Sequence, residues 1–576
     1  MTISQPLSAP DAPARPVVWS IAGLDTSGGA GLSADQRAAD ALGVHLCPIA
    51  AVLTAQHSRG VEALFPVPPE QLQAQLSALA TDLPPRVIKT GLLGSVAAVQ
   101  IVARWVDHFR ASTPPGLDPH RHLALVIDPV LGASAGGTPF STEAVLEAYR
   151  QWLLPRATVV TPNRAEARRL LKRPGGHGAP RQDLPALAVD LMALGARSVV
   201  ITGGDAPHHH PTGPASASWC VDWLATPQAH GWLCAPRIDT PHHHGTGCTF
   251  ATGVAGAWAR GHVDADAVVL AHMLTRDALA GAHAAGAGAG PVKARDGFAL
   301  PGRAGLPWLG LGDELPWQLL HGAPTSETAP ADALRIPPLF APFRAPCDGL
   351  YGILPDGDEL GHAVAAGLRL VQLRHKPRDG LDHHLAQSLS HCAQHGAQLF
   401  VNDHWRDALA LPPRVSAEPG FRLGLHLGQE DLLALSLDDR QRLLAERDRV
   451  MLGLSSHSLW ELARAAGCGA SLIACGPVMP TTTKDMPWRP QGEHNLRWWV
   501  AHSPAPVVAI GGLLTAQDVA RFAACGPAAV CVVRGLGQGA HDMAGRIPPL
   551  RAAAATPQDG RPAPALPEPV LDTGPG

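Results

Sequence analysis

The chain has 576 residues, of which 46% are hydrophobic and 16% are charged, and its formal net charge is -4. This length can hold several domains, and the composition is that of a globular protein. There is no basic excess of the kind that nucleic-acid binding requires, and no apolar run of about 18 residues that could span a membrane. The ten cysteines form no CxxC pair, so we expect reduced thiols in a cytoplasmic protein with neither a nucleic-acid nor a membrane partner.

Three segments are rich in Pro, Ala or Ser and show little periodicity. Residues 1–16 lack the apolar core of a signal peptide and are predicted to be a disordered N-terminus. Residues 321–346 are predicted to be a linker, and residues 553–576 a disordered tail. The pattern therefore predicts two α/β domains, at 17–320 and 347–552.

The first domain alternates apolar runs with helical patterns, which predicts a mostly parallel sheet between two helical layers, a three-layer αβα fold. The predicted buried strands are 17–22, 87–90, 123–128, 158–161 and 198–202.

Glycine-rich turns follow several of these strands. The most informative turn, Gly245-Thr246-Gly247-Cys248, follows the short extended run 236–238, and its glycines bare backbone N–H groups at the start of a helical pattern. Such a turn can hold a phosphate, and we expect the helix N-terminus to lower the pKa of the Cys248 thiol. An ordinary Gly-rich helix cap is the alternative. Two His triplets, 208–210 and 242–244, lack partners at ligand spacing, and we do not expect metal there.

Further polar positions accompany this turn: the Gly-rich segment 23–31, Asp35, Gln56, 89–93, 128–130, 163–166 and 203–204. Together these motifs resemble the hydroxymethylpyrimidine/phosphomethylpyrimidine kinase family, of ribokinase-like fold. The resemblance implies ATP-dependent phosphorylation of a hydroxymethylpyrimidine and then of its monophosphate. It implies that Asp35 and Gln56 bind the pyrimidine, that Asn163 and Glu166 organise Mg²⁺ and phosphates, that Gly245, Thr246 and Gly247 form an anion hole, and that Cys248 is the catalytic base.

The second domain contains eight short apolar runs, most of them separated by helix-length patterns. This count predicts a TIM (β/α)8 barrel. Polar residues follow the runs at the ends where such barrels carry their active sites. The runs are 350–354, 370–373, 399–401, 423–427, 451–454, 472–474, 507–510 and 529–533.

Two features of these strand ends suggest a diphosphate site. Arg374 and Lys376 suit a polyanionic substrate, while Asp403 and Asp431 follow adjacent strands and suit Mg²⁺ bridged to a diphosphate. Two unrelated loop carboxylates are the alternative reading of the acidic pair.

These motifs resemble thiamine-phosphate synthase, which joins hydroxymethylpyrimidine diphosphate to thiazole phosphate and releases pyrophosphate. The resemblance implies that Asp403 and Asp431 bind Mg²⁺. It implies that the pyrimidine diphosphate is held by Gln372, Arg374, Lys376, Asn402, Ser455 and Lys484. The thiazole phosphate would be held by Thr481, Thr483, Gly512 and Val533.

Three positions depart from the two families. Thr202 stands where the kinases commonly have Lys, 354–356 reads Leu-Pro-Asp where the synthases often have a Thr-Asp pair, and Arg534 stands where many have Ser. We expect Arg534 to bind the thiazole phosphate.

The combined expectation is a bifunctional enzyme of thiamine biosynthesis whose partners are its small-molecule substrates. Two alternatives stay open: the kinase half is a non-catalytic ligand-binding module, or it is a pyridoxal-type kinase. The sequence also leaves open whether the chain forms a homo-oligomer and whether the intermediate is channelled.

Overall fold

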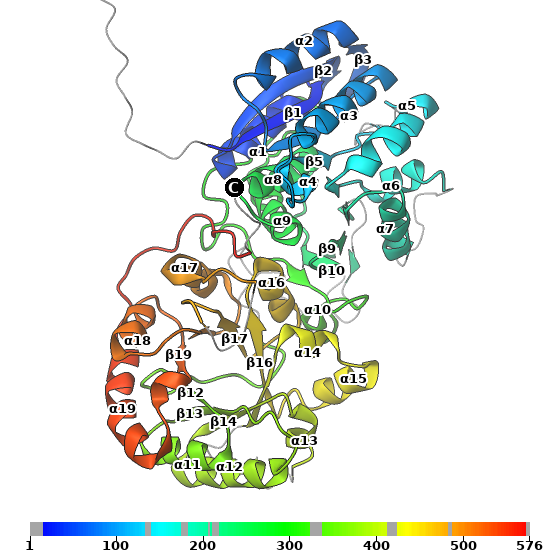
Figure 1. Cartoon of the computed structure of the whole chain (residues 1–576). Coiled ribbons are helices and arrows are strands. Elements are labelled where there is room, and N and C mark those ends of the chain that lie inside the picture. The colour runs from blue at the N-terminus through cyan, green and yellow to red at the C-terminus, as the bar shows by residue number, and fades with distance from the viewer. Residues whose placement is uncertain are drawn as a thin grey trace, which may run out of the picture.

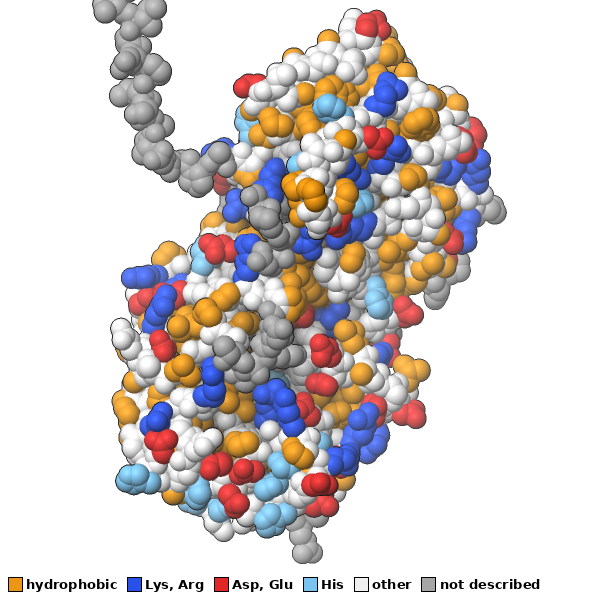
Figure 2. All heavy atoms as spheres, viewed as in Figure 1, with side chains coloured by type: hydrophobic (Ala, Val, Ile, Leu, Met, Phe, Trp, Pro, Cys, Tyr) orange, Lys and Arg blue, Asp and Glu red, His pale blue; other side chains and the backbone are white. Residues whose placement is uncertain are grey.

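The computed structural model describes residues 15–132, 140–173, 183–204, 208–209, 218–322, 337–411, 423–481 and 487–571. The chain forms an N-terminal and a C-terminal lobe that lie against each other (Figure 1). Lys and Arg side chains alternate with Asp and Glu over the face shown in Figure 2, as expected from the small net charge. No helix in the ranges given above is long and apolar enough to cross a membrane. All ten cysteines are unpaired thiols.

The N-terminal lobe is built on one large sheet whose path runs β11-β10-β9-β7-β6-β5-β4-β1-β2-β3, with β8 paired to β9. Along this path the strands β7-β6-β5-β4-β1-β2 are parallel. The antiparallel strands β3 and β9 extend the two ends of this parallel part. The strand bounds are β1 Val17–Leu24, β2 His45–His57, β3 Gly60–Pro66, β4 Val87–Thr90, β5 Ala124–Ile127, β6 Val159–Val160, β7 Ser198–Ile201, β8 His208–His209, β9 Ser218–Ala225, β10 His230–Pro236 and β11 Trp308–Leu309.

Helices cover both faces of this sheet, which confirms the predicted three-layer αβα architecture. One layer packs α1 (Gly31–Leu42), α8 (Thr246–Ala259) and α9 (Asp264–Ala280) against each other. The remaining helices of this lobe are α2 Pro69–Ala80, α3 Val96–Arg110, α4 Pro119–His122, α5 Glu143–Ala148, α6 Arg164–Leu170, α7 Leu184–Ala193 and α10 Trp317–His321, with the short turns η1 Tyr149–Leu153 and η2 Leu154–Arg156.

The C-terminal lobe is a closed barrel of eight parallel strands, as predicted. Its strands are β12 Leu350–Leu354, β13 Leu370–Leu373, β14 Gln398–Asn402, β15 Leu423–Leu427, β16 Met451–Ser456, β17 Leu472–Cys475, β18 Val507–Ile510 and β19 Ala529–Val532. Its helices are α11 Gly357–Ala365, α12 Leu381–His395, α13 Trp405–Leu409, α14 Gln429–Leu433, α15 Leu437–Ala445, α16 Leu459–Gly467, α17 Gly492–His502, α18 Ala516–Ala523 and α19 Gly539–Ala554, with the turn η5 Arg534–Leu536.

Local sequence explains where several barrel helices begin. Asp356, Ser436, Ser458 and Thr515 each precede a helix, and each side chain accepts a hydrogen bond from the backbone N–H three residues later. Such caps satisfy an N–H group that the first turn of a helix would otherwise leave without a partner.

The tail was predicted to be disordered from residue 553, and this is wrong for residues up to 571. Helix α19 continues to Ala554, and the chain beyond it packs along α17. Arg497 makes a bidentate ion pair with Asp559 at 2.7 and 2.6 Å, and Val570 is buried. Polar and proline-rich composition hid these contacts, because they depend on a partner surface that is distant in sequence.

The predicted linker 321–346 is also shorter than expected. Residues 323–336 lie outside the described part of the chain. The backbone N–H of Leu339 donates to the carbonyl of Gly469 at 3.0 Å, and Phe340 is buried against Trp317. Residues 337–343 therefore belong to the packed structure.

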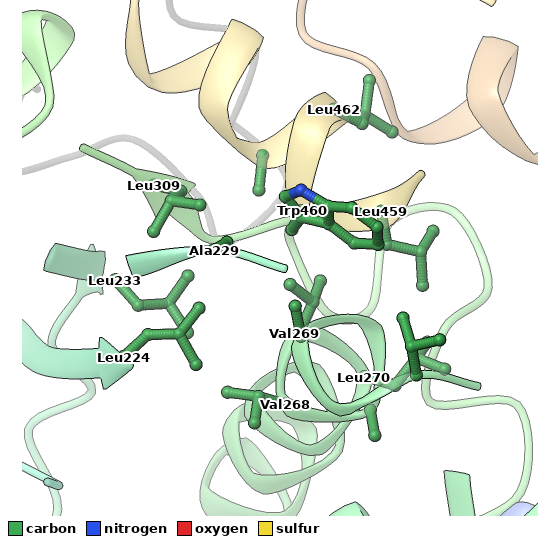
Figure 3. Packing of buried hydrophobic residues seen from close by; sticks show 14 of the residues in the cluster. Leu224, Ala229, Leu233, Val268, Val269, Leu270, Leu309, Leu459, Trp460 and Leu462 are labelled. Atoms are coloured by element: carbon green, nitrogen blue, oxygen red, sulfur yellow. The ribbon is translucent and has the colours of Figure 1, made fainter. Parts of the chain in front are cut away.

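The two lobes share an apolar interface (Figure 3). Leu459 and Trp460, at the start of α16 in the barrel, face Val269 and Leu270 of α9. Leu309 of β11 lies beside them, and its backbone carbonyl approaches Gly467 so closely that a Cβ at that glycine would overlap it. The lobes are therefore packed together and do not hang on a free linker.

Candidate active sites

The first candidate site is a cavity of about 150 Å³ in the N-terminal lobe, where the carboxyl ends of β1, β4 and β5 meet the N-terminus of α8. Of the residues predicted for this site, six line the cavity: Gln56, Asn163, Glu166, Gly245, Gly247 and Cys248. Thr202, the position of the missing Lys, also lines it. Asp35 and Thr246 do not belong to its lining.

Asp35 was predicted to bind the substrate, and its contacts argue against that role. The carboxylate is fully buried and pairs with the Lys89 amine at 2.8 and 2.9 Å. It also accepts hydrogen bonds from the hydroxyls of Ser20 and Thr252. With its oxygens engaged by three partners, Asp35 supports the site from beneath. The sequence could not reveal this, because Asp35 lies on helix α1 and Lys89 on strand β4, 54 residues further along the chain.

Asp25 lines the kinase cavity, although it had not been predicted as a site residue. Burial alone would raise its pKa, but hydrogen bonds from His244, Ser27 and the Ala30 N–H lower it to about 2. His244 joins Asp25 at 2.9 Å and Gln56 at 3.2 Å, so the three form a polar wall of the cavity. His244 belongs to one of the His triplets. Its place directly before the glycine turn was the sequence feature that could have indicated a role in this site.

Glycine is required where the loop 25–31 meets the turn before α8. Gly245 is the N-cap of α8 with φ 86°, and a Cβ there would overlap the carbonyl oxygen of Gly29. The first turn of a 14-residue helix thereby faces the cavity. This geometry suits an anion, because the N-terminal N–H groups of a helix carry partial positive charge.

The expectation of a lowered pKa for Cys248 is wrong. Burial raises the pKa of this thiol to about 12, and the carboxylates of Asp128 and Asp35 add to the rise, while the Lys89 ammonium opposes it. Burial beside two acids therefore governs the pKa of this thiol. Cys248 is therefore a neutral thiol, hydrogen-bonded to Asp128.

Asp128 and Glu166 are the residues best suited to hold a cation in this lobe. Burial raises the pKa of both, and the charge of Asp128 raises that of Glu166 further. The Oδ2 atom of Asp128 is buried without a hydrogen-bond partner. A buried oxygen without a donor beside a second acid is the environment that Mg²⁺ would relieve. Asp128 begins the motif 128–130, and its local sequence does not indicate this role.

The second candidate site is a cavity of about 650 Å³ at the carboxyl ends of the barrel strands. Eleven of the residues predicted for this site line it: Gln372, Arg374, Lys376, Asn402, Asp403, Asp431, Ser455, Thr481, Gly512, Val533 and Arg534. Thr483 and Lys484 lie outside the described residues.

Asp403 and Asp431 lie close enough to influence each other. Burial raises the pKa of Asp403, the negative charge of Asp431 raises it further, and the Arg374 guanidinium opposes both. Asp403 adopts φ 66°, a conformation that few residues other than glycine take. Two acids held together in this way, with Arg374 and Lys376 in the same cavity, fit a divalent cation bound with a polyanion.

A turn of two glycines closes the opposite side of the cavity. Gly511 and Gly512 have φ values of 99° and 78°, and a Cβ on Gly512 would meet Met479 and Pro480 at 2.6 to 2.8 Å. The turn follows β18 and lies beside Arg534, after β19. TIM barrels often bind phosphate at this position.

Among the other residues that line the barrel cavity, His426, His457, Glu461 and Trp488 had not been predicted as site residues. His426 joins the hydroxyl of Ser455 at 3.0 Å, and burial lowers its pKa to about 4, so it is neutral. His457 pairs with Glu461 at 2.8 Å and stacks on Trp488. His426 lies within a buried strand, but His457 directly follows one, and that position was the available signal.

Comparisons with known proteins match each lobe. Residues 25–293 match the phosphomethylpyrimidine kinase family, and residues 355–536 match the thiamine monophosphate synthase family. The thiamine biosynthetic bifunctional enzyme TH1 of Arabidopsis thaliana is 30% identical over 512 residues, covering 86% of this chain and 85% of that protein. A probable bifunctional enzyme of Oryza sativa is 29% identical and covers 88% of this chain and 83% of its own length. Both relatives are described as chloroplastic.

Single-domain proteins match the N-terminal half. The hydroxymethylpyrimidine/phosphomethylpyrimidine kinase of Streptomyces coelicolor is 36% identical, covering 50% of this chain and 97% of its own. Among solved structures, the pyridoxal kinase of Staphylococcus aureus in complex with pyridoxal is 26% identical, with a TM-score of 0.41, covering 49% of this chain and 94% of that one.

Proposed function

The chain belongs to the family of thiamine biosynthetic bifunctional enzymes, and we propose that its two cavities catalyse consecutive steps. The N-terminal site phosphorylates hydroxymethylpyrimidine and then its monophosphate with ATP. The barrel site joins the resulting diphosphate to thiazole phosphate, giving thiamine phosphate and pyrophosphate. One observation carries this proposal: similarity to the bifunctional relatives spans both lobes, and each lobe gathers most of its predicted residues around one cavity.

In the kinase site, the substrate oxygen attacks the γ-phosphorus of ATP, and the bond to ADP breaks. Gln56, Asp25 and His244 form the polar wall that would orient the pyrimidine. The N–H groups at the start of α8 face the cavity and would stabilise the charge that develops on the transferred group. Asn163 and Glu166 cap each other across the first turn of α6, which holds Glu166 in the cavity beside Asp128.

Both sites offer acids that fit Mg²⁺: Asp128 and Glu166 would hold it in the kinase, and Asp403 and Asp431 would hold it in the barrel. When bound, it would neutralise phosphate charge and stabilise the leaving group. Thr202 stands where the kinases commonly have Lys, so the kinase site has one cationic contact fewer at this position.

In the barrel, the C–O bond to the diphosphate breaks, and the thiazole nitrogen forms a C–N bond to the same carbon. No proton has to be removed, which agrees with His426, because its pKa of about 4 makes the imidazole a poor base. Arg374 and Lys376 would stabilise the departing pyrophosphate, while Gly512, Thr481 and Arg534 would hold the thiazole phosphate.

The test is synthesis of thiamine phosphate in one vessel from the pyrimidine alcohol, ATP, Mg²⁺ and thiazole phosphate. Formation of product supports both activities. Failure from the alcohol, with success from the pyrimidine diphosphate, would leave only the synthase. Pyridoxal assayed in parallel tests the remaining alternative, and a higher kcat/KM for pyridoxal would contradict the assigned kinase substrate.

The ten unpaired thiols favour a reducing compartment, which we propose to be the cytoplasm.

A further inference from the structure

One side chain of the kinase lobe caps a helix of the synthase barrel. The Oδ1 atom of Asp266, near the start of α9, accepts hydrogen bonds from the backbone N–H groups of Leu459 at 2.8 Å and Trp460 at 3.2 Å. These are the first two residues of α16. Asp266 is 1% exposed, so its carboxylate is sealed within the interface.

The capped end of α16 is part of the synthase cavity wall. It follows β16, and Ser455, His457 and Glu461 all line the cavity. Within this turn Glu461 accepts hydrogen bonds from both the backbone N–H and the ring of His457, at 2.6 and 2.8 Å. His457 and Glu461 therefore lie within three residues of the N–H groups that Asp266 holds.

Side chains around this turn fix it from the barrel as well. Gln491 donates to the carbonyl of His457 at 2.8 Å, and the Trp499 indole donates to the Ser456 hydroxyl at 2.7 Å. Ser458 accepts from the Glu461 N–H, so the barrel supplies its own cap for a different N–H group. The N–H groups of Leu459 and Trp460 are the ones for which the kinase lobe supplies the acceptor.

The packing around Asp266 makes this support rigid. Leu459 and Trp460 lie against Val269 and Leu270 of α9 (Figure 3). Gly467, at the other end of α16, contacts the backbone of Leu309 in β11. Both ends of the helix are thus held by the kinase lobe, and a shift of α9 would move the wall of the synthase cavity.

We infer that Asp266 of the kinase lobe is a positioning residue for the synthase, which orients the first turn of α16 so that His457 and Glu461 face the synthase cavity. The inference rests on the synthase activity proposed above. Removal of the acceptor leaves two buried N–H groups without a partner, and the turn should shift or loosen. The consequence is felt in the synthase, although the mutated residue belongs to the kinase lobe.

The experiment compares three variants of the full chain, Asp266→Ala, Asp266→Asn and Asp264→Ala. We expect Asp266→Ala to lower synthase kcat/KM about tenfold, as small displacements of catalytic walls do, with kinase kcat/KM unchanged. Asp266→Asn keeps an acceptor oxygen and should restore most of the loss. Asp264 is the matched control: it is buried in the same helix but accepts from Ser198 and Trp258 inside the kinase lobe, so Asp264→Ala should leave the synthase unchanged.

A KM comparison and hydrogen exchange separate positioning from general damage. Because Ser455 and His457 share one wall, KM should rise for the pyrimidine diphosphate more than for thiazole phosphate. In Asp266→Ala, amide exchange should increase in residues 457–462 and not in the glycine turn 511–512. Wild-type synthase kinetics in Asp266→Ala, or unchanged exchange at 457–462, would overturn the inference. An inactive wild type would instead contradict the proposed function, and the exchange result would still decide whether Asp266 holds the turn.

Discussion

At the scale of single residues, Cys248 is the position whose role depends most on its surroundings. Its thiol is neutral and hydrogen-bonded to Asp128 at the N-terminus of α8. The pyrimidine alcohol must lose a proton during attack, whereas the monophosphate, with a second pKa of about 6, is already largely ionised. A base at this position should therefore matter for the first phosphorylation and much less for the second.

We predict that Cys248→Ser lowers kcat for the alcohol by about 100-fold and changes kcat for the monophosphate little. Only the thiolate accepts a proton, and burial raises the pKa of the thiol to about 12, so the wild-type rate with the alcohol should keep rising between pH 7 and 9. Both rates are measured at saturating ATP. An equal fall in both steps, or a fall in neither, would show that Cys248 is only a small apolar filler.

The acidic pair of the barrel gives a second prediction. Asp403→Asn or Asp431→Asn should reduce synthase activity to background and leave kinase activity intact, because each change removes a charged oxygen from the proposed Mg²⁺ site. Activity is measured across a Mg²⁺ titration. Wild-type turnover of either variant at limiting Mg²⁺ would show that the pair does not bind the metal.

Arg534 gives the third. It lines the barrel cavity beside the Gly511-Gly512 turn, where a guanidinium can bind phosphate with two hydrogen bonds. Arg534→Ser should raise KM for thiazole phosphate about tenfold or more and leave KM for the pyrimidine diphosphate nearly unchanged. An equal rise in both constants would indicate a general defect of the barrel.

At the scale of elements, the junction of α9 and α16 should carry a pH dependence. Burial raises the pKa of Asp266 to about 8, although the N–H groups of Trp460 and Leu459 oppose the rise, and Glu461 is the neighbouring acid that adds to it. Between about pH 4 and 8 the folded chain therefore holds a proton that the unfolded chain has released. The free energy of unfolding should fall as pH rises through this window.

The fourth prediction uses the variant that cannot ionise. Asp266→Asn should lack this fall, so its Tm minus that of the wild type should increase from pH 5 to pH 8 and then level off. Thermal unfolding followed at several pH values checks the trend. Parallel Tm curves for the two proteins would mean that Asp266 keeps an ordinary pKa in the interface.

Elements buried on both faces were the ones that sequence predicted best. All eight barrel strands lie within about two residues of their predicted apolar runs, since a strand covered on both faces must be apolar throughout. In the N-terminal lobe, strands β2, β3, β8, β9, β10 and β11 were missed. Strand β9 contains the buried Asp222, which interrupts its apolar run and accepts from the Gly203 N–H. Its pattern therefore did not resemble a buried strand.

The same limit applies to the sites. Residues at the carboxyl ends of predicted strands could be assigned to a cavity, as Arg374 and Asp403 were. The buried position of Asp35 could not be predicted, because its partner Lys89 lies on β4, 54 residues further along the chain. His457 and Glu461 owe their positions to a helix whose first turn is capped by the other lobe. Contacts between segments distant in sequence are what the local pattern could not supply.

At the scale of the whole molecule, the lobes are joined by more than the chain connection. Helix α16 packs on α9 and β11, and Arg440 of the barrel pairs with Glu314 of the N-terminal lobe at 3.2 Å. The tail returns from the barrel to the first lobe, where Pro569 lies beside Gly261. Sequence composition indicated two separable domains. Because the lobes are packed together, we expect the separated domains to stay associated and the barrel to be fully active only in that complex.

The fifth prediction is that fragments cut near Ala331, when co-expressed, purify as one complex through a tag on either fragment and retain both activities. The cut falls between the two cores, so each core stays whole, and the α16 interface can form without the peptide bond.

The barrel fragment expressed alone would expose Leu459 and Trp460 and lose the Asp266 cap. Its synthase activity should be lower and should recover when the kinase fragment is added. Size-exclusion chromatography and both assays check this. Fragments that separate and are each fully active alone would show that neither lobe depends on the other, and loss of both activities on cutting would contradict the division into two domains.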